Sequence, residues 1–243
     1  MRQSLTAAAT AASILALSAC SEGRAQSAGP AVSRSWQVGN FTGLEVSGPY
    51  DVKVVTGKAV SVAANGPQRL LDDTDVVVEG GKLHIRPKKK NWLAGMASWR
   101  SSGPSTFTIT VPSLEQAEVA GSGDIDIDRV AGERFKGAIA GSGSLRLPQV
   151  AVRDLGLTIA GSGEITAAGQ AQQASYEIAG SGGLDASRLR AGNASAEIAG
   201  SGDIKAFATG TARASIAGSG DIAITGGARC TSSKNGSGDI RCS

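Results

Sequence analysis

The chain has 243 residues, of which 41% are hydrophobic, only 4% are aromatic and 34 are glycine. This length suits one all-β domain, and the scarcity of aromatic rings favours a repetitive scaffold filled by aliphatic side chains over a core built on large rings. The formal charge of +3, or +2 once Arg2 is removed with the export signal described next, is too balanced to indicate nucleic-acid binding.

Residues 1–19 predict an export signal. The basic Arg2 precedes an apolar stretch that is too short to predict a membrane span and that ends in small residues. The letters LSAC at residues 17–20 resemble the bacterial lipobox, which implies cleavage before Cys20 and attachment of lipid to its thiol. An ordinary cleaved signal that contains a cysteine is the alternative. Acyl chains at Cys20 would anchor the protein to a membrane without a transmembrane helix.

Residues 20–35 predict a lipidated N-terminus and a flexible tether, because they are small and polar and show no apolar periodicity. The folded domain is therefore expected over residues 36–243. Ser21, directly after the cysteine, resembles the outer-membrane sorting pattern. The expected location is the cell envelope, as an exported outer-membrane lipoprotein that faces the periplasm or the cell surface.

Residues 36–115 predict an irregular first part of the domain. Alternating apolar residues, among them Val52, Val54 and Val62, indicate strands with one buried face. A short helix is expected at Pro67–Asp72, where proline occupies the first position.

The segment 86–100 carries five basic residues, two tryptophans and no acid. It predicts a loop between two strands, whose residue types suit an anionic membrane surface or a glycan. The alternative is a solvated loop whose tryptophans fold back onto the domain. The candidate surface-binding residues are Lys88, Lys89, Lys90, Trp92, Trp99 and Arg100.

Residues 116–243 are built from repeats. GSG begins at residues 121, 141, 161, 180, 200, 218 and 236, so each unit has 18–20 residues. Alternating apolar residues follow each GSG, as in DIDID from Asp124, and another short strand precedes it, as in LTIA from Leu157. A helix-free unit of this size cannot bury its apolar face alone. Identical units are therefore expected to stack in parallel as a β-solenoid.

The predicted stacking places glycines at corners and apolar side chains in two inward columns. Glycine suits a corner because it adopts positive φ and leaves room for the next rung. GSG does not predict a phosphate-binding loop, because neither a helix nor a lysine follows it. Adjacent rungs are expected about 4.8 Å apart. The columns consist of Ile125, Leu145, Ile165, Leu184, Ile204, Ile222 and Ile240, and of Val119, Ile139, Ile159, Ile178, Ile198 and Ile216.

The same alignment predicts a column of acidic residues directly after GSG. Its last three members fall on consecutive rungs, where like charges about 4.8 Å apart repel. Solvent, the nearby Lys205, Arg229 and Arg241, or a divalent cation would compensate them, although the nine-residue calcium-binding pattern of β-rolls is missing. The column consists of Asp124, Glu164, Asp203, Asp221 and Asp239.

Two cysteines, Cys230 and Cys242, remain once Cys20 is lipidated. Because an exported protein meets an oxidising environment, they predict one disulfide at inward positions of the last two rungs, where it would clamp the end of the solenoid. Two buried free thiols are the alternative.

Three stretches together resemble the head GIN domain family of bacterial exported proteins, also described as an auto-transporter adhesin domain. They are FTGLEVSGPYDVKVVTG from Phe41, FTITVPSLEQAEVAGSGDI from Phe107, and the later GSGDI units. The resemblance covers residues 36–240. It implies a right-handed parallel β-solenoid in the cell envelope.

The functional expectation is a non-catalytic envelope lipoprotein, an adhesin-like or structural module that binds an envelope glycan or protein. No catalytic residue, cofactor, metal ligand or nucleic-acid partner is predicted, because the one histidine, His84, lies in the strand-like KLHIR without the motif of a Ser-His-Asp site. The alternative is a polysaccharide-active or divalent-cation-binding exported protein.

Overall fold

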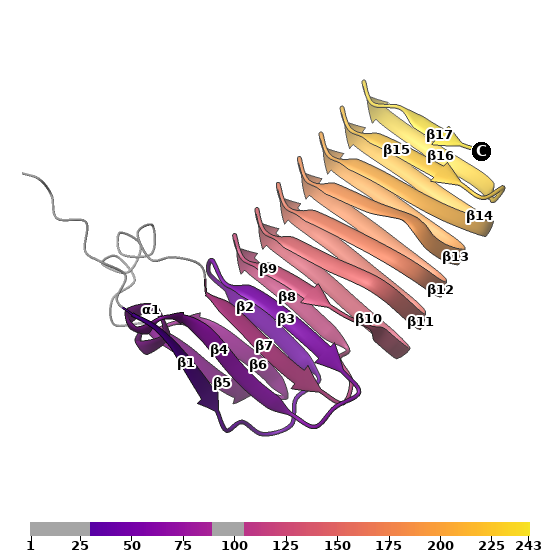
Figure 1. Cartoon of the computed structure of the whole chain (residues 1–243). Helices are drawn as coiled ribbons and strands as arrows, with labels where there is room; N and C mark the ends of the chain where they lie inside the picture. Colours follow the sequence, from indigo (N-terminus) through magenta and orange to yellow (C-terminus); the bar gives the residue numbers. More distant parts are fainter. Residues whose placement is uncertain (1–29, 89–104) are drawn as a thin grey trace, which may run out of the picture.

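The computed structural model describes residues 30–88 and 105–243. These residues form a 17-stranded sheet wound into a β-solenoid of about six turns, as the sequence predicts. Figure 1 shows the rungs stacked in chain order from β10 to the C-terminus, with the first strands gathered at the opposite end. Within these two ranges, no helix is long and apolar enough to cross a membrane.

The first part of the domain contains shorter elements and some antiparallel pairs. Strand β4 pairs antiparallel with β1 and β7, and β5 pairs antiparallel with β6, whereas β2 and β3 pair in parallel with later strands. The elements are β1 (Ala31–Trp36), β2 (Gly43–Ser47), β3 (Asp51–Thr56), β4 (Ser61–Pro67), α1 (Gln68–Asp72), β5 (Thr74–Glu79), β6 (Lys82–Pro87) and β7 (Thr106–Val111).

The strands of the repeat part pair only in parallel. Strands β11 to β14 have 16–18 residues each, nearly a whole rung, so each of them runs through several sides of the solenoid, with register shifts in some of the pairings. The elements are β8 (Gln116–Gly121), β9 (Asp124–Ile127), β10 (Val130–Gly141), β11 (Ser144–Gly161), β12 (Glu164–Gly180), β13 (Gly183–Gly200), β14 (Asp203–Gly218), β15 (Asp221–Thr225), β16 (Arg229–Gly236) and β17 (Ile240–Cys242).

The tether predicted over residues 20–35 extends too far, because the first strand of the domain already begins at Ala31. Residues 31–36 form β1, which pairs along its whole length with β4. Val32 and Trp36 pack against the core, and Arg34 donates a hydrogen bond to the carbonyl oxygen of Leu71 at 2.9 Å and pairs with Asp72. These partners lie more than 30 residues away in sequence, so the local composition of this polar segment does not reveal them.

The helix expected at Pro67–Asp72 is confirmed as α1, with Pro67 as the residue before its first turn. Leu70 and Leu71 on this helix are buried. Together with β1, the helix lies at the N-terminal end of the stack (Figure 1).

Both predicted inward columns are confirmed by the strand register. Their members are buried, except that Ile240 on the last rung is partly exposed. The second column continues into the first part of the domain through Val46, which pairs in register with Val119, and through Ile85, which pairs with Val46. One hydrophobic core therefore runs through the described residues.

The corner between β13 and β14 shows why the repeat needs glycine. Gly200 has φ +137°, and a Cβ atom there would lie 2.2 Å from the carbonyl oxygen of Gly180 on the preceding rung. The amide of Ser201 donates a hydrogen bond of 2.8 Å to that same oxygen. The rungs therefore approach each other too closely at this corner for any side chain.

The chain's two tyrosines, Tyr50 and Tyr176, are fully buried. Burial raises the pKa of both phenols above the usual 10.0; for Tyr50 the hydrogen bond with Thr74 partly opposes this rise and the charge of Asp73 adds to it. Tyr176 Oη has no hydrogen-bond partner in the described part of the chain. The neutral phenols therefore contribute stability that is complete below pH 10 and is lost as the pH rises above it.

We expect tyrosinate absorbance to appear only together with loss of the β-sheet circular dichroism signal when the protein is titrated above pH 10. Tyr176→Phe is expected to move alkaline unfolding to higher pH, because it removes a buried group that must ionise as the chain unfolds. Reversible ionisation of both tyrosines near pH 10 in the folded protein would contradict this prediction.

Candidate functional site

Cys20 lies outside the described residues. So do five of the six predicted surface-binding residues, namely Lys89, Lys90, Trp92, Trp99 and Arg100. Lys88 is described and follows β6. Its amide donates to the carbonyl oxygen of Asp73 at 2.8 Å, and its Nζ donates to the carbonyl oxygen of Asp72 at 2.6 Å. Lys88 is thus held at the end of α1.

The acidic residues after GSG do stack, and the structure shows what their carboxylates contact. Asp203 pairs in register with Asp221. The amide of Asp221 donates to Asp203 Oδ1 at 3.2 Å, and the amide of Asp239 donates to Asp221 Oδ1 at 2.8 Å. Each carboxylate thus accepts a hydrogen bond from the backbone of the next rung, which offsets part of the repulsion.

The last member, Asp239, lies 3.3 Å from a guanidinium nitrogen of Arg241 and 3.9 Å from Lys234 Nζ. At the other end of the column, Asp124 accepts hydrogen bonds from both the amide and the hydroxyl of Ser144, at 3.0 and 2.7 Å. Over residues 30–88 and 105–243, no group of three or more His, Cys, Asp or Glu residues is arranged to hold a metal ion.

The disulfide between Cys230 and Cys242 is confirmed, with the two Cα atoms 6.4 Å apart. Cys230 stacks on the inward residue Ala212 and Cys242 on the inward residue Ile224, as predicted for the last two rungs. Both cysteines are nevertheless exposed, because no described strand stacks on their outer side. The disulfide joins β16 to β17 across the end face of the solenoid.

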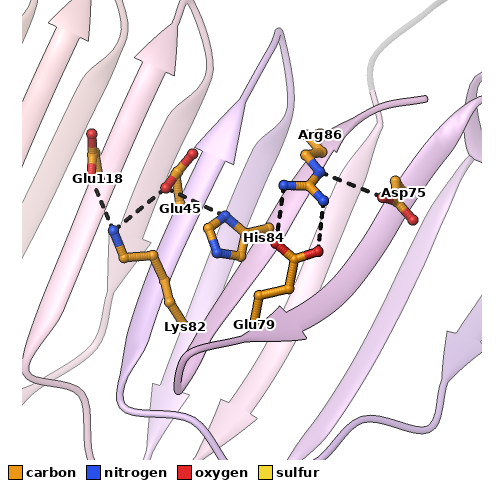
Figure 2. Close-up of polar contacts among 7 residues, drawn as sticks. All are labelled: Glu45, Asp75, Glu79, Lys82, His84, Arg86 and Glu118. Carbon is orange, nitrogen blue, oxygen red and sulfur yellow. Dashed lines mark hydrogen bonds and ion pairs between the residues drawn. The ribbon is translucent and has the colours of Figure 1, made fainter. Parts of the chain in front are cut away.

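A polar cluster on β2, β6 and β8 was not predicted from the sequence. Glu45 pairs in register with both His84 and Glu118, so the three side chains stand side by side. Figure 2 shows Lys82 between the two carboxylates, 3.4 Å from Glu45 and 3.3 Å from Glu118. His84 Nδ1 lies 3.3 Å from Glu45 Oε2. This arrangement pairs charges across three strands and places His84 beside Glu45, but the buried His84 Nδ1 makes no hydrogen bond in the described part of the chain.

Arg86 continues this row at the outer strands. It contacts Glu79 at 2.8 Å and Asp75 at 3.5 Å, and its hydrogen bond to Glu79 is the main reason that the pKa of its guanidinium is raised (Figure 2). The alternating letters KLHIR predict that Lys82, His84 and Arg86 point outward from β6. The partners of Arg86 lie on the adjacent strand β5, whereas those of Lys82 and His84 lie on β2 and β8.

A groove runs along the outside of the repeat part, across β11 to β16. The groove has a volume of about 590 Å³ and lies between two columns of outward-pointing side chains. The small inward residues Ala174, Ala194 and Ala212 form its floor. A second hollow of about 720 Å³ shares Gln173 and Asn193 with it. The polar residues of the groove are Asp154, Gln173, Ser175, Asn193, Ser195, Thr211, Arg213, Arg229 and Thr231.

Three solved structures with the same fold span nearly the whole chain. A "putative adhesin" from Bacteroides fragilis aligns with a TM-score of 0.79 at 23% identity, over 88% of this chain and 97% of its own. A "putative lipid binding protein" from Parabacteroides distasonis aligns with a TM-score of 0.70 at 26% identity, over 88% and 97%. A "putative adhesin" from the same species aligns with a TM-score of 0.67 at 18% identity, over 88% and 98%.

No curated protein matches the chain. The family model described as "Putative auto-transporter adhesin, head GIN domain" matches residues 40–228. This match runs from β2 to β15 and includes every GSG corner except the last, as the resemblance in the sequence predicts. The chain therefore belongs to the head GIN domain family.

Proposed function

We propose that the protein is a non-catalytic lipoprotein of the cell envelope whose solenoid serves as an adhesive binding module. The observation that carries this proposal is the register of the outer surface, where polar side chains recur at the same position on successive rungs. Such rows offer many weak contacts of the same kind to an extended partner, which suits attachment better than reaction at one centre. Membership of an adhesin-like family supports the same function.

The contacts of His84 support a non-catalytic role. Its one contact in Figure 2 is with Glu45, and that carboxylate is also paired with Lys82. The carboxylates of Asp203 and Asp221 are likewise bonded to the backbone of the next rung. The Lys88–Arg100 segment remains a predicted second contact for an envelope glycan or an anionic membrane.

A lipid anchor at Cys20 is part of the proposal, and it predicts a clear effect of Cys20→Ser. In a Gram-negative host supplied with labelled palmitate, we expect the native chain to carry label and to sediment with the membranes. Cys20→Ser is expected to lose the label and to appear in the soluble envelope fraction, because no acyl chain remains to partition into the bilayer. Ser21→Ala, which leaves the thiol intact, should keep the label.

The same Cys20→Ser protein supplies soluble chain for the binding test. It is immobilised and exposed to detergent-solubilised envelope fractions and to purified envelope polysaccharides, and retention is measured by surface plasmon resonance. Saturable retention supports adhesion. No retention of any envelope component contradicts it, and heat released on titration with Ca²⁺ instead supports the cation-binding alternative. If the native chain carries no labelled palmitate, the lipid anchor at Cys20 is contradicted. The adhesive function is then tested by this binding assay alone.

A further inference from the structure

The groove on the repeat part is bounded by two outward columns that follow the solenoid axis. The register aligns the first column in the order Arg134, Asp154, Gln173, Asn193, Thr211 and Arg229, and the second in the order Lys136, Gly156, Ser175, Ser195, Arg213 and Thr231. We call this surface the axial groove. Its residues come from β10 to β16 and are exposed or half-buried.

Positive charge is concentrated at the two ends of the axial groove. Arg134 and Lys136 stand at the N-terminal end, where they line an adjoining hollow of about 300 Å³ together with Glu115 and Lys82. Arg213 and Arg229 stand at the C-terminal end. These four exposed cations have no ion-pair partner among the described residues. They are therefore available to a ligand.

The one acidic residue of the two columns, Asp154, is paired with Arg153. Arg153 lies 3.0 Å from Asp154 and also 3.0 Å from Glu133. The hydrogen bond to Asp154 is the main reason that the pKa of Arg153 is raised. The two columns therefore carry four cations against one carboxylate, and the cations stand at the two ends of the groove.

The middle of the groove carries neutral hydrogen-bonding groups. Asn193 Oδ1 accepts hydrogen bonds from the amide and the hydroxyl of Thr211, at 3.0 and 2.7 Å, which fixes the side chain so that its NH₂ group remains to donate. The hydroxyl of Ser195 donates to that of Ser175 at 3.1 Å. With Gln173, these groups form a row of donors and acceptors suited to hydroxyl groups.

The separation of the charges selects the kind of ligand. Arg134 and Arg229 lie five register steps apart, which corresponds to about 24 Å. A single small anion cannot contact both ends. An extended chain that carries hydroxyl groups along its length and acidic groups at intervals can do so, with arginine holding each carboxylate by paired hydrogen bonds.

We propose that the axial groove binds a linear acidic polysaccharide, extended along the solenoid axis. This inference rests on the proposed adhesive function and names its ligand class and its site. The rung spacing is close to the length of one sugar in an extended chain, so successive sugars meet equivalent positions on successive rungs. Lipid headgroups fit less well, because the groove presents small, buried apolar residues and no exposed apolar side chain that could enter a bilayer.

The test uses full-length Cys20→Ser protein with polygalacturonate oligomers of increasing length, and dextran as the neutral polymer. When Arg213→Gln and Arg229→Gln are added to this protein, we expect its affinity for polygalacturonate to fall by about tenfold or more, because two charge-assisted contacts are lost. Affinity of the unaltered groove should rise with oligomer length up to about five or six sugars, the span of the groove, and should fall with added salt.

The matched control is Arg146→Gln with Arg188→Gln. These two exposed arginines lie on another side of the solenoid, beside Pro148 and Thr166, so this variant loses the same charge without touching the groove. It is expected to bind polygalacturonate within about twofold of the unaltered groove. Circular dichroism confirms that both variants are folded.

Several outcomes overturn the inference. Equal loss in the two double variants shows that only net charge matters, and equal binding of dextran shows that acidic groups are not required. Tighter binding to phosphatidylglycerol vesicles that the groove variant abolishes identifies a membrane as the occupant. If the groove variant binds envelope fractions as well as the unaltered protein does, the axial groove is not the binding site, but the adhesive function is still supported. If neither protein binds any envelope component, the adhesive function itself is contradicted.

Discussion

Gly200→Ala is expected to lower the free energy of unfolding by about 3–5 kcal/mol. The added Cβ would meet the carbonyl oxygen of Gly180 at 2.2 Å, and alanine would have to adopt a φ near +137°. That oxygen belongs to backbone fixed by the hydrogen bond from Ser201, so it cannot move aside without separating two rungs. Urea unfolding followed by circular dichroism measures the effect as a lower midpoint.

Gly183→Ala is the matched control for this prediction. Gly183 occupies the position on its rung where Glu164 and Asp203 stand on the neighbouring rungs, and a Cβ there would meet no atom within 4 Å. We expect a change of no more than about 0.5 kcal/mol, because an alanine at this half-buried position meets no steric conflict. Equal midpoints for the two alanine variants would contradict the proposed role of the GSG corner.

Removal of the disulfide by Cys230→Ser with Cys242→Ser is expected to open the last rung. The disulfide closes a segment with a sequence separation of 12, for which loop closure contributes about 3 kcal/mol. Little else holds this rung, because every residue of β16 is exposed and Lys234 occupies the column position that Ile216 fills on the rung below. Protection of its backbone amides from hydrogen exchange should fall by about hundredfold.

Ser232→Ala with Ser233→Ala controls for substitution on the same strand, since it leaves the disulfide intact. These residues are exposed, so protection of the last rung should remain within about threefold of the native value. The disulfide variant is also expected to associate at high concentration, because opening of the last rung uncovers the edges of β14 and β15. Unchanged protection and a monomeric state after removal of both thiols would contradict this role.

Much of the repeat part was predictable because its signals are local. The inward columns follow from the strand period of two, and the constant spacing of GSG sets which residues share a column. The pairing of Cys230 with Cys242 followed from the same alignment and an oxidising location. Their exposure was missed, because the alignment does not say that the last rung lacks a neighbour.

The first part of the domain was less predictable. Residues 31–35 of β1 were predicted to belong to the tether because Val32 is the only large apolar residue among them, and the stability of β1 depends on β4, which follows some 30 residues later. The antiparallel pairing of β5 with β6 depends on the turn at Gly80 and Gly81, both with positive φ, and the alternation of the strands does not specify their direction.

The sequence by itself determined the β-solenoid, its rung length, its glycine corners and its core columns. It could do so because steric exclusion at a glycine corner and the alternation of a strand act between near neighbours and recur at every rung. Only the tertiary structure decided the charge cluster around Lys82 and the composition of the axial groove. Outward positions do not have to be apolar, so no periodic signal marks them, and their contacts arise only when rungs about 20 residues apart are stacked in register.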